Sequence, residues 1–160
     1  MTNRRRSKFA AAVTLIEVMA ASALLVVVIL GASTYRYHAA LLEKQAAMQM
    51  ASSDFASLLS GGWRGASETL AYDPQVSLSS HLSISKVRTS RDAAPLGFKL
   101  LGRYVASIDD VVYYALLSWR DATPTLRELN VVVSWSQTDP QTYDVSKADK
   151  SYKLTTYASR

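Results

Sequence analysis

The sequence has no cysteine among its 160 residues and few glycines, prolines and histidines. Without cysteine there is no disulfide framework, no thiolate metal ligand and no thiol nucleophile. The two histidines, His38 and His81, have no second ligand at a recognisable spacing, so a zinc site is not expected. The Gly-x-Ser-x-Gly turn of serine hydrolases is also missing. We therefore expect a protein that is not an enzyme and that needs no metal or cofactor.

Acidic residues are absent from the first 16 positions, whereas basic residues gather there at Arg4, Arg5, Arg6 and Lys8. These four supply most of the net charge of +5, because the other 14 basic residues nearly balance the 13 acidic ones. An N-terminal basic cluster is typical of a targeting signal and gives little reason to expect a nucleic-acid partner. Because Lys and Arg beside a membrane segment remain in the cytoplasm, the cluster predicts a cytoplasmic N-terminus.

A long apolar run follows the basic cluster, from Phe9 to Tyr35. Its last 23 residues, Val13 to Tyr35, would span roughly 34 Å as an α-helix. The hydrocarbon core of a bilayer is roughly 30 Å thick, so residues 13–35 are predicted to cross a membrane once. An ordinary secretory signal cut near Gly31 is the competing interpretation, although such signals have shorter apolar cores.

One charged residue, Glu17, interrupts this run. A carboxylate this deep in an apolar helix costs at least a few kcal/mol, so it requires a partner. The first turn of a helix also favours a carboxylate, through the helix dipole and the free N–H groups. A contact within one chain is therefore an alternative to a contact between chains.

The segment Thr14-Leu15-Ile16-Glu17-Val18 resembles the N-terminus of type IV prepilins and type II secretion pseudopilins. In that family a basic leader ends in a small residue, and a Thr-Leu-Ile-Glu sequence opens the mature helix. The resemblance makes residues 1–12 the leader and the Ala12–Val13 bond the processing junction. Two departures are Ala12, where the family usually has Gly, and Val13, where it usually has Phe.

The resemblance implies a function in filament assembly. The amine exposed at Val13, which the family methylates, would pair with Glu17 of a neighbouring subunit and set the register of the filament. The implied partners are a prepilin peptidase, other pilin or pseudopilin subunits, an inner-membrane assembly platform and membrane lipid. The protein would lie in a bacterial inner membrane as a single-pass protein with a periplasmic head. Thr34, where many major pilins have Pro, favours a pseudopilin or minor pilin.

Two other functions remain open. The first is a single-pass anchored periplasmic domain that binds a ligand or partner and never polymerises. The second is a DNA-uptake minor pilin that uses a loose basic cluster, although a solvated loop is the simpler interpretation and nucleic acid is not an expected partner. The members of this basic cluster are Lys86, Arg88, Arg91, Lys99 and Arg103.

Beyond the membrane segment, residues 36–60 predict an amphipathic continuation of the same helix. Its apolar stripe includes Leu41, Met48, Ala51, Phe55 and Leu58. Gly61-Gly62 is expected to end the helix, since glycine adopts the left-handed C-terminal conformation without penalty. Trp63, directly after the glycines, is expected to cover the helix end at the start of a loop.

Residues 61–160 predict a head rich in β-strands. The clearest strand has alternating residues from Leu129 to Ser136, and 111–119 is apolar on both faces, as in a central strand. Further strands are expected within 76–84, at 98–106 with an interruption at Gly102, and at 152–157. One long helix followed by four to six strands with short connections indicates an α+β fold, with the helix packed on an antiparallel sheet as in pilins.

The remaining carboxylates give weak signals. Asp109-Asp110 is interpreted as a solvated turn before the central strand. Asp139, Asp144 and Asp149 lie in a late polar loop, where some pseudopilins hold calcium, but their spacing matches no calcium-binding loop.

Overall fold

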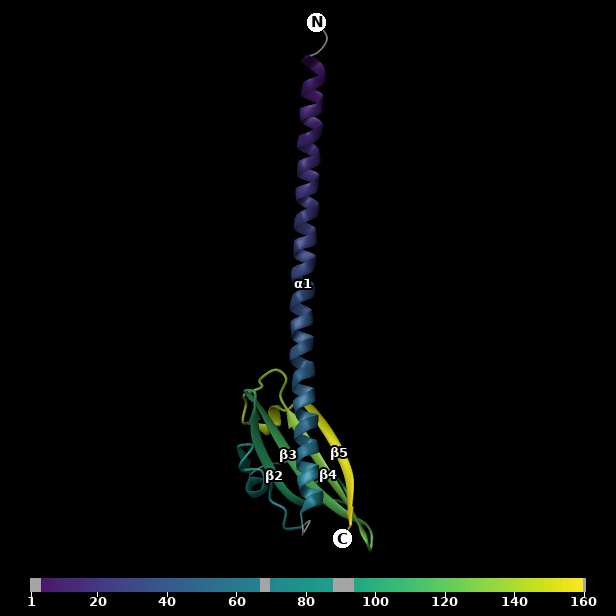
Figure 1. Cartoon of the computed structure of the whole chain (residues 1–160), viewed down its shortest axis with the longest axis vertical. Coiled ribbons are helices and arrows are strands. Elements are labelled where there is room, and N and C mark those ends of the chain that lie inside the picture. Colours follow the sequence, from purple (N-terminus) through teal and green to yellow (C-terminus); the bar gives the residue numbers. More distant parts are fainter. Residues whose placement is uncertain (1–3, 67–69, 88–93, 160) are drawn as a thin grey trace. The chain divides into compact units, whose positions relative to one another are not determined.

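The computed structural model describes residues 4–66, 70–87 and 94–159, with side chains from Thr14 onward. The chain divides into two compact units, residues 1–44 and residues 45–160. The described elements are α1 (Arg4–Gly65), α2 (Pro74–Ser77), β1 (Ile84–Lys86), β2 (Lys99–Ile108), β3 (Val111–Thr123), β4 (Leu126–Trp135), the 3₁₀ turn η1 (Val145–Lys147) and β5 (Lys150–Ser159). Figure 1 shows these elements in sequence colours.

The five strands form one antiparallel sheet in the order β1-β2-β3-β4-β5. β3 is the central strand, as its apolar sequence predicts, and it pairs along most of its length with β2 and β4. The C-terminal part of α1 packs on this sheet (Figure 1). The predicted α+β fold, a long helix on an antiparallel sheet, is therefore confirmed.

Within the second unit, α1 buries a stripe formed by Met48, Phe55, Leu59 and Trp63. Their spacing of seven, four and four residues keeps them on one face of a helix. The expected stripe is right at Met48 and Phe55 and wrong at Leu58, which is 43% exposed. Leu59 is buried in the core instead, because a spacing of four residues places it on the same helix face as Phe55, one turn further along.

The side chains of the sheet alternate between two faces. Tyr113, Leu117, Val131 and Val133 face α1 and form the core with it. The Tyr113 hydroxyl donates a hydrogen bond of 3.1 Å to the carbonyl of Met48. This bond ties the central strand to the helix at the start of the second unit.

Several sequence expectations between α1 and β2 are wrong. α1 does not end at Gly61-Gly62 but continues to Gly65, so Trp63 lies within the helix and is fully buried. The expected strand beginning at Val76 is instead helix α2. Asp73 caps this helix by accepting a hydrogen bond of 3.0 Å from the Gln75 amide, and Pro74 occupies its first turn. Of the expected segment 76–84, only its last residue, Ile84, lies in a strand, as the first residue of β1.

The remaining strands agree with the sequence in type and differ in length. A register shift in β2 between Leu100 and Gly102 matches the expected interruption. β3 extends to Thr123, beyond the expected end at Trp119, which leaves a tighter turn at Pro124. Asp109 and Asp110 form the two-residue hairpin loop between β2 and β3, both with positive φ, 49° and 61°. Asp tolerates this conformation better than most residues.

Replacing Gly61 or Gly62, near the end of α1, with alanine is predicted to have opposite effects on the stability of the protein. A Cβ at Gly62 would lie 2.6 Å from the Tyr72 hydroxyl oxygen, whereas a Cβ at Gly61 has no atom within 4 Å. Tyr72 is buried and stacked on Trp63, with 6.2 Å between ring centroids, so it has little freedom to move. Gly62→Ala is expected to destabilise the protein by about 1–3 kcal/mol. Gly61→Ala should stabilise it by up to about 1 kcal/mol.

Chemical unfolding of the full chain in detergent, followed by tryptophan fluorescence, measures both changes. Equal effects of the two substitutions would show that the Tyr72 contact does not constrain the helix.

The buried tyrosines predict a loss of head stability in alkali. Burial raises the pKa of Tyr72 and of Tyr113 to about 12, aided by the charges of Asp73 and Asp109 respectively, and it raises the pKa of Tyr104 as well. An unfolded tyrosine ionises near pH 10. The folded state therefore binds more protons, and the unfolding free energy should fall between pH 10 and pH 12. Unfolding titrations at pH 9, 10 and 11 test this, and Tyr113→Phe should reduce the slope. An unchanged midpoint across this range would contradict the prediction.

Candidate functional site

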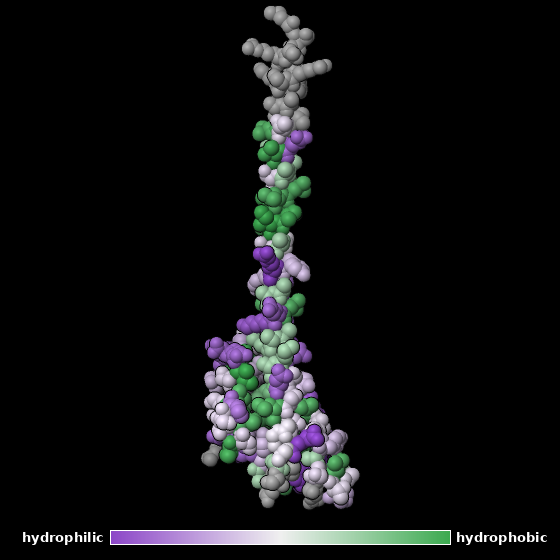
Figure 2. Space-filling model, in the orientation of Figure 1, coloured by the Kyte–Doolittle hydropathy of each residue, from purple (hydrophilic) through white to green (hydrophobic). Residues whose placement is uncertain are grey.

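Among the described residues, one helical segment is long and apolar enough to cross a membrane, namely Thr14–Gly65 within α1. Every residue from Thr14 to Ala47 is exposed in the isolated chain. Large apolar side chains gather along this part of the helix (Figure 2), including Leu15, Ile16 and Val18 and the run from Leu24 to Leu30. A bilayer or a bundle of similar helices would cover such a surface.

Three hydroxyl groups of the apolar segment donate hydrogen bonds to its own backbone. Ser22 donates to the carbonyl of Val18 at 2.7 Å, and Ser33 donates to the carbonyl of Ile29 at 2.8 Å. Thr34 likewise donates to the carbonyl of Leu30 at 3.0 Å. Polar groups inside a bilayer have no water available, so they require partners of this kind. These serines and the threonine therefore suit an apolar environment.

Glu17 is the exception in this segment. Its side chain is exposed, and none of the described side chains forms a hydrogen bond or an ion pair with it. No other Asp, Glu, Lys or Arg occurs between Val13 and Tyr35. A lone carboxylate on an apolar surface is a candidate site for a cation supplied from elsewhere.

The backbone places the proposed junction close to Glu17. Ala12 and Val13 lie within α1, but their side chains are outside those described. Val13 and Glu17 are four residues apart, so they share one helix face about one turn apart. The side chains of the basic cluster, Arg4, Arg5, Arg6 and Lys8, are likewise outside those described. The spacing of Val13 and Glu17 is compatible with a contact within one chain and with a contact between chains.

Aromatic and basic residues follow the apolar run. Tyr35 and Tyr37 are 76% and 65% exposed, and the rings of Tyr37 and His38 meet edge to face at 5.8 Å. With Arg36 they form the kind of belt that lies at a membrane–water interface.

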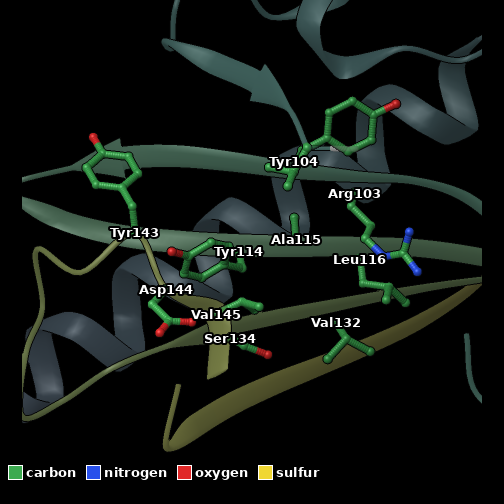
Figure 3. Close-up of a pocket in the computed structure, with 11 residues that line it drawn as sticks. Arg103, Tyr104, Tyr114, Ala115, Leu116, Val132, Ser134, Tyr143, Asp144 and Val145 are labelled. Carbon is green, nitrogen blue, oxygen red and sulfur yellow. The ribbon is translucent and has the colours of Figure 1, made fainter. Parts of the chain in front are cut away.

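A second candidate site is a cavity of about 130 Å³ on the sheet face opposite to α1. Figure 3 shows Tyr114, Tyr143 and Asp144 on one side of it and Arg103 on another. Tyr114 donates a hydrogen bond of 3.1 Å to the Thr142 carbonyl, and the Asp144 carboxylate accepts hydrogen bonds from Ser146. These bonds lower the pKa of Asp144. The Tyr114 hydrogen bond thus joins the loop before β5 to the sheet, whereas the Asp144 bonds lie within that loop.

Sequence reasoning missed this cavity. Tyr114 and Ser134 pair across β3 and β4, but Tyr143 comes from a loop whose position depends on contacts distant in sequence. Alternation along β3 and β4 could have identified the outward-facing residues. No local signal indicated that the loop would cover them.

The three carboxylates of the late polar loop each have a different partner. Asp139 pairs with Lys147 at 3.5 Å, Asp144 caps η1, and Asp149 accepts a hydrogen bond of 2.8 Å from the Gln137 amide. Within the described ranges, no group of three or more His, Asp or Glu side chains is arranged to hold a metal ion.

The basic cluster considered for DNA is also dispersed. Lys86 lies 4.0 Å from Asp73, and Lys99 lies over the ring of Trp119 at 5.0 Å. Arg103 lies at the cavity described above, whereas Arg88 and Arg91 fall outside the described residues. This arrangement supplies no continuous basic surface among the described members.

Comparison with known proteins finds no match: neither protein-family models, nor curated proteins, nor solved structures are similar to this chain. Indications of the function therefore come from the chain itself, mainly from Glu17 and the helix around it.

Membrane insertion predicts a position-dependent response to arginine. Leu25 and Met50 are both exposed apolar residues on α1, at 62% and 67% exposure, but only Leu25 lies in the apolar segment. Leu25→Arg adds about 2.5–3.5 kcal/mol to the insertion free energy. It should therefore release protein from the membrane fraction after alkaline carbonate washing. Met50→Arg should leave retention unchanged, and equal behaviour of the two variants would contradict a membrane span around Leu25.

Proposed function

We propose that this chain is a prepilin-like subunit, a pseudopilin or a minor pilin, that assembles through α1 into a type IV pilus or type II secretion filament. The observation that supports the proposal is Glu17, an exposed carboxylate without a described partner in the apolar part of α1. Its place within Thr14-Leu15-Ile16-Glu17-Val18 resembles that of the prepilin glutamate. The α1-on-sheet fold agrees with a pilin head.

The proposed mechanism begins with removal of residues 1–12 by a prepilin peptidase on the cytoplasmic side. Hydrolysis of the Ala12–Val13 bond gives a new amine at Val13, which is a cation and a substrate for methylation. The Glu17 carboxylate of an adjacent subunit pairs with this amine. Two opposite charges in an apolar environment gain by pairing, whereas either one alone is strongly disfavoured. The pair therefore sets the axial position of each helix in the bundle.

This mechanism defines the partners and the location. Before assembly the protein lies in a bacterial inner membrane, with the basic cluster in the cytoplasm and the head in the periplasm. An inner-membrane assembly platform then moves the subunit into a filament of other pilin or pseudopilin subunits. The exposed residues between Thr14 and Tyr35 exchange lipid for neighbouring helices.

One observation favours a second candidate, an anchored periplasmic domain that never polymerises. Val13 and Glu17 lie one turn apart on α1, so the amine and the carboxylate of one chain are close enough to neutralise each other. In that case a partner subunit is not required.

The mass of the N-terminal peptide of membrane-purified protein tests the processing step. The filament proposal expects a chain that starts at Val13, with or without an added methyl group. A start at Met1, or near Ser33, would contradict it.

Glu17 should be required for assembly, whereas another exposed carboxylate of the same helix should not. Glu17→Gln removes the charge and nearly keeps the shape, and it should lower crosslinking between α1 helices at least about tenfold, because it leaves the Val13 amine unpaired. Glu43→Gln is the matched control, since Glu43 is exposed on α1 beyond the apolar run. Crosslinks between single cysteines introduced at Ala23 measure both variants in membranes. Unchanged crosslinking in Glu17→Gln would contradict an assembly role.

A further inference from the structure

The cavity on the sheet face opposite to α1 has an apolar floor. Leu116 of β3 and Val132 of β4 are paired across the two strands, and both line the cavity of about 130 Å³ together with Val145 of η1. Both side chains are half-buried. A sheet face in contact with water normally presents polar residues. The apolar floor, Leu116 and Val132, is therefore the kind of surface that a small ligand covers.

The hollow extends beyond the cavity. A second hollow of about 320 Å³ shares Leu116, Val132, Ser134 and Val145 with it and reaches Ser151 of β5. The two hollows thus form one groove over β3, β4 and β5. A ligand that is longer than the cavity has room to continue along this groove.

The wall of the cavity is held in place by the sheet. The Val112 amide donates a hydrogen bond of 2.7 Å to the Pro140 carbonyl, and the Asp149 amide donates one of 3.2 Å to the Trp135 carbonyl. With the Tyr114 hydrogen bond described above, the loop before β5 is joined to the strands at three points. A cavity with fixed walls loses little conformational freedom when a ligand binds.

Two opposite charges line this one cavity without pairing with each other. Asp144 lies on one side and Arg103 on the other (Figure 3). Among the described residues no cation forms an ion pair with Asp144. Its Oδ1 atom accepts both hydrogen bonds from Ser146, which leaves Oδ2 without a described partner. The Arg103 guanidinium has five N–H donors, so it can bind a carboxylate and keep other contacts.

The strand register indicates how far apart the two charges lie. Arg103 of β2 is paired with Leu116 of β3, and Tyr114 lies two residues away along β3. Two residues of a strand span roughly 7 Å. Asp144 lies near Tyr114, because burial and the charge of Asp144 both raise the pKa of the Tyr114 hydroxyl. This separation matches the length of a short chain with a charge at each end.

The two charges also select against ligands that carry only one. A cation attracted by Asp144 would meet the like charge of Arg103 in the same cavity, and an anion attracted by Arg103 would meet that of Asp144. Like charges placed close together at an interface reduce the affinity. A ligand with both charges gains both contacts and avoids this cost.

We propose that the cavity binds a small zwitterion whose ammonium group and carboxylate are joined by a short chain, as at the two ends of a dipeptide. The Asp144 carboxylate, beside the exposed ring of Tyr143, binds the ammonium group. The Arg103 guanidinium binds the carboxylate through two parallel hydrogen bonds. The apolar floor contacts the chain between the charges. This site lies in the head and does not depend on the proposed function of Glu17.

Methyl NMR of the full chain in detergent micelles, with ¹³C-labelled leucine and valine methyl groups, tests the site. The probe is 5-aminopentanoate, which has the length of a dipeptide backbone. It should shift the methyl signals of Leu116 and Val132, whereas those of Leu129 and Val131, which are buried in the core, should not move. An absence of shifts at Leu116 and Val132 would overturn the proposal.

Two ligands with a single charge provide the matched comparison. Pentanoate lacks the ammonium group of 5-aminopentanoate, and butylamine lacks its carboxylate. The Kd of 5-aminopentanoate should be at least about threefold lower than that of either analogue, the effect of one additional exposed ion pair. An equal Kd for the zwitterion and either analogue would overturn the need for two charges.

Substitutions assign each charge to its side of the cavity. Asp144→Asn should raise the Kd of 5-aminopentanoate at least about threefold and should not weaken pentanoate binding. Asparagine also caps helical turns well, so η1 should persist. Arg103→Gln should weaken 5-aminopentanoate similarly and should not weaken butylamine binding.

Asp54→Asn is the control, because Asp54 is an exposed carboxylate of α1, and it should leave every Kd unchanged. An Asp144→Asn variant that binds 5-aminopentanoate as well as the unchanged chain, or that also loses pentanoate, would contradict the assignment of Asp144 to the ammonium group.

Discussion

A single helix in this protein has to satisfy two different environments. Between Thr14 and Ala47 its side chains are exposed, and most of those before Tyr35 are apolar. From Met48 to Trp63 one face is buried against a sheet. The second environment comes from the chain itself, whereas the first must come from lipid or from other helices. Glu17 lies in the first, and its charge is the constraint that any account of the function has to explain.

The features that the sequence predicted correctly are those set by local pattern. Alternation from Leu129 to Ser136 predicted β4, and the apolar run from 111 to 119 predicted a central strand. The candidate site at Glu17 could also be predicted from the sequence, because a carboxylate in an apolar run is recognised without any tertiary structure. The position of Glu17 on an exposed helix face agrees with that analysis, although its role in assembly remains a proposal.

The errors lie where tertiary contacts or capping override pattern. Gly61-Gly62 predicts a helix end, but burial of Trp63 against Tyr72 continues α1 to Gly65. The alternating residues from Val76 resemble a strand, yet the Asp73 cap and Pro74 start α2 instead. Tyr143 reaches the cavity on the sheet only through the loop before β5. In each case the structure depends on a residue that lies outside the short stretch of sequence from which the prediction was made.

The central claim is that the Glu17 carboxylate meets the Val13 amine of a different subunit. Solid-state NMR on membrane-assembled protein tests it most directly, with ¹³C-labelled glutamate in one half of the subunits and ¹⁵N-labelled valine in the other. The account predicts magnetisation transfer between the Glu17 carboxyl carbon and the Val13 nitrogen, over about 4 Å, the reach of an ion pair. Transfer that occurs only when both labels are in the same chain would contradict it.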